Sequence, residues 1–329
     1  MVKKHTSHCL ILSIALIQQF TLSESVTQAQ TRFSMSAGAW VPVLPEYEAG
    51  LRGDSANLAG PHADLYRDDQ TGVGGQLNLT SFYHFAGTRT MFESDLQLAG
   101  IDSLGSGRRF DDAGPGQSVL FAGLDGASQV ATMAGQSMTI GVENDVFHLH
   151  KYIGLRDRFN LDWIGLGKID LGFGFSYMLF DQDIDTTATL STGAISRYKE
   201  DLDSTYLGGE FRSTLIQPVF GKLFYFDARF GIYEMDADYA GISNIQSLPG
   251  GALTRGTALD TLTQTTTTFD LAIRTDMYIW GMHCRPTVGF KYFDDMASID
   301  HPAGIGVGDS ATLRTGQAYF YNATLEFLF

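Results

Sequence analysis

Residues 169–179 read IDLGFGFSYML, and the side chains alternate between two kinds along the whole stretch. The odd-numbered positions are apolar or aromatic, whereas the opposing positions begin with Asp170 and continue with small or polar residues as far as Ser176. A period of two places the two sets on opposite faces of a β-strand. The stretch exceeds the roughly 5–6 residues of ordinary strands and reaches the roughly 9–11 that cross a bilayer at a tilt.

The same alternation recurs along the chain and predicts ten strands in all. The strongest repeats lie at residues 224–232, 269–279 and 319–329. Weaker versions complete the set, at residues 33–41, 77–85, 92–98, 138–142, 207–215 and 288–292.

The predicted connections differ in length according to their order. Long stretches rich in Gly, Asp and Ser follow the odd-numbered strands, whereas short ones follow the even-numbered strands, with turns expected at residues 86–88, 217–218 and 281–284. Outer-membrane barrels combine short periplasmic turns with long outer loops in this way. We therefore expect an all-β, antiparallel, up-and-down transmembrane β-barrel of about ten strands, with 8–14 strands left open by the pattern.

The composition excludes several classes of protein. The chain is 44% hydrophobic but only 18% charged, and its formal net charge is −15. An acidic chain of this kind has no basic footprint for nucleic acid. Most of its acids are aspartate, which favours turns over helix interiors.

The N-terminus predicts export from the cytoplasm. Lys3 and Lys4 precede the apolar run 10–17, and a polar stretch follows as far as Gln30. This order is typical of a secretory signal peptide. We expect residues 1–30 to be cleaved, with the site itself weakly marked, and residues 31–329 to form one barrel domain. The mature chain would keep Cys284 as its one cysteine and form no internal disulfide.

The C-terminus ends on an aromatic residue, with apolar residues at alternate positions before it: Tyr321, Leu325, Phe327 and Phe329. This ending resembles the C-terminal assembly signal of bacterial outer-membrane β-barrel proteins. The resemblance implies the outer-membrane assembly machinery as a partner and the bacterial outer membrane as the location.

Two stretches within residues 143–238 carry a second resemblance. WIGLGKIDLGFGFSYMLFDQD and YLGGEFRSTLIQPVFGKLFYFDARFGIY resemble the Legionella-type major outer membrane protein family and related planctomycete barrels. Members of that family are regarded as porins or surface antigens. The resemblance supplies no catalytic motif, so it implies no functional residue in this chain.

Charged residues recur on the faces that oppose the apolar ones, often with opposite signs two positions apart, as in Glu210 and Arg212. A base that faced lipid at the bilayer midplane would cost roughly 2–4 kcal/mol, so these groups are expected to line the lumen. The predicted lumen-lining residues are Glu210, Arg212, Asp227, Arg229, Asp270, Arg274, Asp276, Arg285, Lys291 and Glu326. Two interpretations stay open: an open pore with charged walls, or a salt-bridged network that fills a narrow barrel.

The predicted outer loops carry two further features. We expect the longest loop, residues 101–134, to be a surface hairpin, with a constriction folded into the lumen as the alternative. Acidic clusters, above all Asp181, Asp183 and Asp185, offer oxygen ligands that could hold Ca²⁺ or Mg²⁺ and bridge lipopolysaccharide. They lack the spacing of a calcium-binding loop, so solvated charge is the favoured interpretation, and no other cofactor is expected.

Catalytic constellations find little support in the sequence. Asp181 with Asp183, and Asp300 with His301, supply the residue types of an omptin-like protease without its context. His148 and His150 fall near a predicted periplasmic turn, away from the outer leaflet where a barrel lipase would act. We expect no enzyme.

The favoured function is a passive, porin-like channel for small hydrophilic solutes. The alternative is a closed structural or surface-interaction barrel whose acidic loops bind ions, lipopolysaccharide or host molecules. A barrel hydrolase is a remote third. The oligomeric state and the permeant stay open.

Overall fold

The computed structural model describes residues 31–54, 63–68, 70–111, 117–127, 129–131, 137–161, 167–246, 249–301 and 310–328. The predicted signal peptide and Phe329 lie outside these residues. No helix in the described part of the chain is long and apolar enough to cross a membrane.

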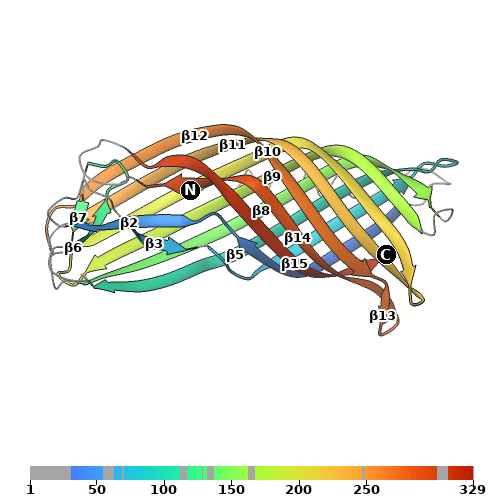
Figure 1. Cartoon of the computed structure of the whole chain (residues 1–329), viewed down its shortest axis with the longest axis horizontal. Coiled ribbons are helices and arrows are strands. Elements are labelled where there is room, and N and C mark those ends of the chain that lie inside the picture. The colour runs from blue at the N-terminus through green and yellow to red at the C-terminus, as the bar shows by residue number, and fades with distance from the viewer. Residues whose placement is uncertain are drawn as a thin grey trace.

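Ten antiparallel strands form a closed ring (Figure 1). The ring closes because the first strand pairs with the last, and because β12 also pairs with β14. Its strands are β1 (Thr31–Val43), β4 (Gly74–His84), β5 (Thr90–Asp111), β8 (Ser137–Asn160), β9 (Lys168–Leu190), β10 (Ile195–Val219), β11 (Lys222–Gln246), β12 (Thr254–Thr275), β14 (Met282–Asp300) and β15 (Thr312–Leu328). The short β13 (Met277–Ile279) pairs with the start of β14. The predicted antiparallel barrel of about ten strands is confirmed.

The outward face of the barrel changes character part-way along each long strand. On β9 the outward side chains include Phe173 and Phe175, which are 63% and 76% exposed. Past Leu179 the outward positions of the same strand become Asp181 and Asp183. β11 changes in the same way between its outward residues 232 and 234. An apolar belt therefore surrounds one half of the barrel, as the roughly 25 Å lipid-facing band of a membrane barrel would. We call the other half the outer extension.

The outer extension corrects the predicted loops. The connections after β9 and β11 are short, residues 191–194 and 247–253, because their strands continue well beyond the apolar belt. Their alternation continues there with the polarity exchanged, so that acids face outward and apolar residues face inward. The acidic cluster of Asp181, Asp183 and Asp185, which was predicted to lie in a loop, therefore lies on the outward face of β9.

The short turns lie at the opposite end. The turn predicted at residues 86–88 is confirmed, since β4 ends at His84 and β5 begins at Thr90. The other two predictions are displaced by a few residues. The chain reverses at Phe220–Gly221 and at Trp280–Gly281, where all four residues have positive φ between 50° and 80°. A two-residue hairpin turn that matches strand twist needs this conformation at both positions, and glycine adopts it without a steric cost.

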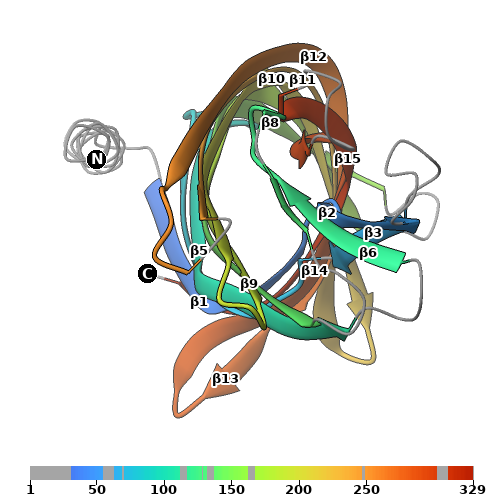
Figure 2. The same ribbon diagram turned by 90° about the vertical axis from the view of Figure 1, so that its left-hand side faces the viewer.

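A second sheet of four strands lies at the outer end of the barrel (Figure 2). It consists of β2 (Tyr47–Asp54), β3 (Ala63–Asp68), β6 (Gln117–Ala122) and β7 (Gln129–Ala131). Tyr47, Phe121 and Leu124 are fully buried and pack against the inward-facing apolar residues of the long strands. Of the predicted loop 101–134, residues 101–111 thus continue β5 in the barrel wall, whereas Phe121 and Leu124 pack inside the mouth, which corrects the expectation of a surface hairpin.

Candidate functional site

Arg212 is the centre of a network of charges inside the barrel. Its guanidinium lies 2.8 Å from Glu93, 3.1 Å from Asp95 and 2.5 Å from Glu210. Its carbon atom Cζ sits 3.5 Å from the centre of the Tyr152 ring. Because β8 and β9 separate β5 from β10 in the ring, the contacts with Glu93 and Asp95 can form only across the interior. With its side chain 1% exposed, Arg212 is one of the most buried groups of the chain.

The network continues towards the end that carries the short turns. Arg229 bridges Asp95 and Asp270 at 3.6 and 3.9 Å. Arg274 lies 2.9 Å from Asp227 and 3.5 Å from Glu326.

Near the turns the network ends at Arg285, which lies 2.5 Å from Asp276 and 3.9 Å from Glu326. Lys291 sits apart, with Nζ 3.2 Å from the Met178 sulfur and 5.0 Å from the Phe293 ring centre. The structure thus places all ten predicted lumen-lining residues on the inner wall, and it joins nine of them through ion pairs. We call these ten, together with Glu93, Asp95 and Arg156, the charged layer.

Sequence reasoning missed three members of this layer and part of its surroundings. Glu93 and Asp95 occupy the polar face of β5, and Arg156 binds Glu93 at 3.0 Å. Arg158 forms a bidentate pair with Asp170, with both N···O distances 2.7 Å. Arg156 and Arg158 lie two residues apart on β8 and therefore on one face of the strand. This spacing could have identified them if the strand predicted at residues 138–142 had been extended to residue 158.

A polar cavity of about 90 Å³ lies within the charged layer. That volume is large enough to hold several water molecules. Its lining combines charges with amides and hydroxyls, among them Asp227, Arg229, Asp270, Arg274, Asn78, Gln97 and Asn322.

A layer of contacting aromatic rings lies in the lumen next to this cavity. His148 lies 4.0 Å from Phe180, measured between ring centres, and Trp40 lies 5.5 Å from Phe320. Phe180 also contacts Phe320 and Phe293, at 5.4 Å each. All five side chains are buried, and they come from five strands of the ring. We call Trp40, His148, Phe180, Phe293 and Phe320 the aromatic septum.

The septum sits at the outer edge of the apolar belt. On β9, Phe180 lies between the outward Leu179 and the outward Asp181, where the wall changes from apolar to acidic. Phe293 occupies the matching place on β14, between Tyr292 and Asp294. Inside the belt the lumen therefore holds the charged layer, and beyond the septum it holds the apolar residues that pack around the second sheet. The septum lies between the two.

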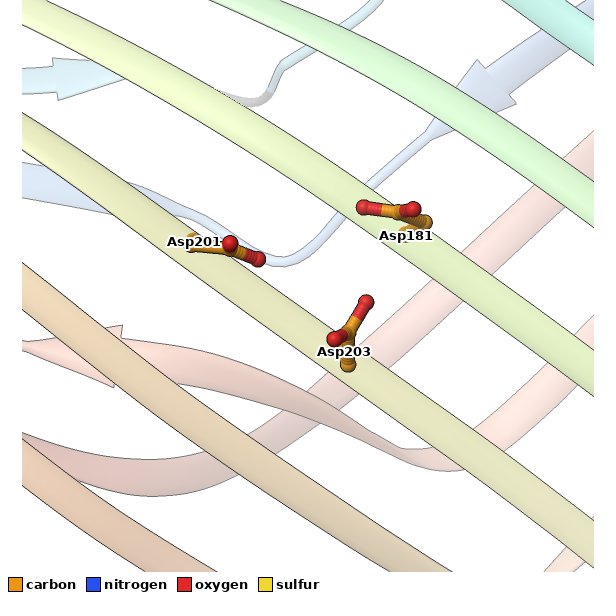
Figure 3. A group of neighbouring side chains, drawn as sticks. All are labelled: Asp181, Asp201 and Asp203. Atoms are coloured by element: carbon orange, nitrogen blue, oxygen red, sulfur yellow. The ribbon is translucent and has the colours of Figure 1, made fainter. Parts of the chain in front are cut away.

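Three aspartates gather on the outside of the barrel (Figure 3). Carboxylate oxygens of Asp181, Asp201 and Asp203 lie within 4.8 Å of one another, with Asp181 on β9 and the others on β10. The predicted trio of Asp181, Asp183 and Asp185 does not come together. It runs along one strand, and Asp185 instead pairs with Lys199 at 3.4 Å.

The histidines weighed for catalysis lie elsewhere than predicted. His148 and His150 are in the middle of β8, inside the lumen, rather than near a periplasmic turn. His150 Nε2 lies 2.7 Å from Ser176 Oγ and 3.2 Å from Glu210, deep in the charged layer. His301 pairs with the buried Glu200 at 2.8 Å.

Three of the four residues of the predicted assembly signal lie on β15. Tyr321, Leu325 and Phe327 occupy its outward positions, opposite the inward Glu326, and Tyr321 is exposed. Phe329 lies outside the described residues.

Comparison with known proteins gives distant structural similarity only. No protein-family model matches the chain, and no curated protein matches it. The translocator domain of the autotransporter NalP from Neisseria meningitidis is 10% identical, with 99% of this chain and 98% of that chain covered and a TM-score of 0.41. The outer membrane protease OmpT from Escherichia coli is 8% identical, with 93% and 99% covered and a TM-score of 0.35. The toluene transporter TodX from Pseudomonas putida is 9% identical, with 94% and 92% covered and a TM-score of 0.24.

Proposed function

We propose that this chain is a bacterial outer-membrane β-barrel, exported by residues 1–30 and inserted by the outer-membrane assembly machinery. The apolar belt supports the membrane location, because exposed rings such as Phe173, Phe175 and Phe230 surround a lumen that holds buried charges. Lipid favours this polarity, whereas water favours the reverse. The outward alternation at the end of β15 supports the assembly route.

The function that the geometry supports best is that of a closed barrel with a structural or surface-interaction role. The aromatic septum carries this proposal, since five buried rings fill the lumen where a channel would need water. The outer extension presents acidic strand walls to the surroundings. Ions, lipopolysaccharide bridged by divalent cations, and host molecules are the partners we propose for it. No catalytic role is proposed, and a fluorogenic peptide or lipid assay tests that with turnover as the contrary result.

A passive porin remains the second candidate. The specific observation in its favour is the polar cavity in the charged layer, whose lining of Arg229, Arg274, Asp227 and Asp270 could select solutes by charge. The family resemblance of residues 143–238 agrees with both candidates, since that family includes porins and surface antigens. A porin would require the septum and the mouth to rearrange.

Recording from the purified protein in planar lipid bilayers separates the two candidates. We expect no discrete conductance steps, because the septum leaves no continuous polar path. Regular steps of one size would favour the porin. In that event Arg229→Glu and Arg274→Glu should shift ion selectivity towards cations, and unchanged selectivity would place the conducting path outside the charged layer.

A further inference from the structure

His301 joins the second sheet to the wall of the outer extension. It follows the end of β14, and its side chain lies between β2 and β10. Its Nδ1 is 2.6 Å from the carbonyl oxygen of Glu48 on β2. Its Nε2 is 2.8 Å from a carboxylate oxygen of Glu200 on β10. The imidazole ring is therefore a bridge between a segment in the mouth and the barrel itself.

The two nearest partners of the ring are hydrogen-bond acceptors, which favours the doubly protonated ring. A backbone carbonyl and a carboxylate have no proton to give, so each ring nitrogen must carry one. Neutral imidazole has a single N–H and would turn a lone pair towards one of the two oxygens. The observed geometry is thus that of the imidazolium, and it depends on the protonation of His301.

The hydroxyl of Tyr47 on β2 also lies 3.4 Å from His301 Nε2. Glu200 also accepts hydrogen bonds from Tyr47 of β2 at 2.5 Å and from Tyr239 of β11 at 2.8 Å. The Tyr198 ring of β10 stacks on the imidazole at 5.6 Å between centres. Thr186 of β9 contacts the Tyr47 hydroxyl at 2.8 Å and does not titrate.

Two further charged groups face this region from β14 and β15. Arg314 lies 3.3 Å from the Glu48 carboxylate and 3.8 Å from Asp300. Among the described residues, His301 is therefore the cationic partner of the buried Glu200, while Arg314 pairs with Glu48 and Asp300.

We propose that His301 is a pH-sensitive latch that tightens the attachment of β2 in the mouth of the barrel while the ring is protonated and loosens it when the proton is lost. On deprotonation the ring can keep its bond to Glu200 or its bond to Glu48, but not both. Either choice breaks one of the two hydrogen bonds by which the ring joins β2 to β10, and it leaves the direct bond between Tyr47 of β2 and Glu200 of β10 as the remaining connection. The inference is independent of whether the barrel conducts, because it concerns the outer extension alone.

The direction of the pH dependence follows from the two partners. Burial alone would lower the pKa of His301, but the Glu200 carboxylate and the hydrogen bonds outweigh it and hold that pKa above 6.5. Burial alone would raise the pKa of Glu200, but His301, Tyr47 and Tyr239 hold it below 4.5. The latch is therefore complete between about pH 4.5 and 6.5. It weakens as the pH rises through the His301 pKa, and again as the pH falls through that of Glu200.

Hydrogen exchange of the purified barrel in detergent, read by mass spectrometry on peptides that cover residues 44–50, tests the latch. After correction for the intrinsic rate, we expect protection in the wild type to fall at least about tenfold between about pH 6 and about pH 9, the loss of one charge-assisted hydrogen bond. His301→Ala and Glu200→Gln should show the low protection at both pH values. His283→Ala, which removes a half-exposed histidine near the opposite end, should behave as the wild type.

The outcome decides the proposal in either direction. Protection of residues 44–50 that is equal at both pH values in the wild type would overturn it, as would a pH response that survives in His301→Ala. Retained heat-modifiable gel mobility shows that each variant still forms the barrel. Glu200→Gln, which changes no volume, provides the test if His301→Ala fails to assemble.

Discussion

Replacement of Arg212 by methionine is expected to lower the free energy of unfolding by about 3–5 kcal/mol. Methionine fills much of the same volume, but it leaves Glu93, Asp95 and Glu210 without the guanidinium that lies between them. Three carboxylates would then share a buried site with little compensation. Urea unfolding of the barrel in lipid vesicles, followed by tryptophan fluorescence, measures the effect.

A matched control lies on the same strand. Lys199 of β10 faces outward, is 69% exposed, and pairs with Asp185 at 3.4 Å. Exposed pairs of this kind contribute about 0–1 kcal/mol, so Lys199→Met should be nearly neutral. Equal losses in the two variants would show that the charged layer is not held by Arg212.

The half of the fold that carries the apolar belt could be predicted from the sequence. Apolar side chains alternate there with polar ones, and the apolar set faces outward, as lipid requires. Residues 169–179 predict both the strand and its outward face correctly. From Asp181 onwards the same strand continues with the opposite polarity, since its outer wall meets water and its inner wall meets the second sheet. A pattern of acids and threonines looks like a loop when only lipid-facing strands are sought. The predicted loops were too long for this reason.

The charged layer could be predicted only in part. Alternation assigns Glu210 and Arg212 to the inner face, but it does not indicate which strands face each other across the ring. The pairing of Arg212 with Glu93 depends on the curvature of the closed sheet, to which residues far apart in sequence contribute. The sequence therefore indicates which side chains of one strand share a face, but not which of them meet across the lumen.

The septum escaped prediction for a different reason. Trp40, Phe180 and Phe320 are single aromatic residues at inward positions, and each lies on a strand whose apolar face points the other way. Taken alone, each resembles a break in the pattern. Only the register places them at one height, where the outer wall also changes from apolar to acidic. An aromatic residue at that change of polarity, repeated on several strands, is the signal to look for.

Phe180→Ala is expected to lower the free energy of unfolding by about 3–5 kcal/mol. The ring touches His148, Phe293 and Phe320, and all of them are buried. Its removal costs the transfer of the aromatic side chain and leaves a cavity that rigid strand backbones cannot close. The same urea titration in vesicles measures the change, and greater quenching of tryptophan fluorescence by acrylamide should accompany it, since Trp40 belongs to the same stack.

Phe175→Ala provides the comparison, since it removes an identical side chain from the outward face of the same strand. Phe175 is 76% exposed on the apolar belt, where lipid can fill the space that the ring vacates. The cavity contribution is then absent, so the loss should be less than half of that at Phe180. A larger loss at Phe175 than at Phe180 would mean that the lumen is loosely filled at this level. The septum could then not be the barrier that keeps the barrel closed.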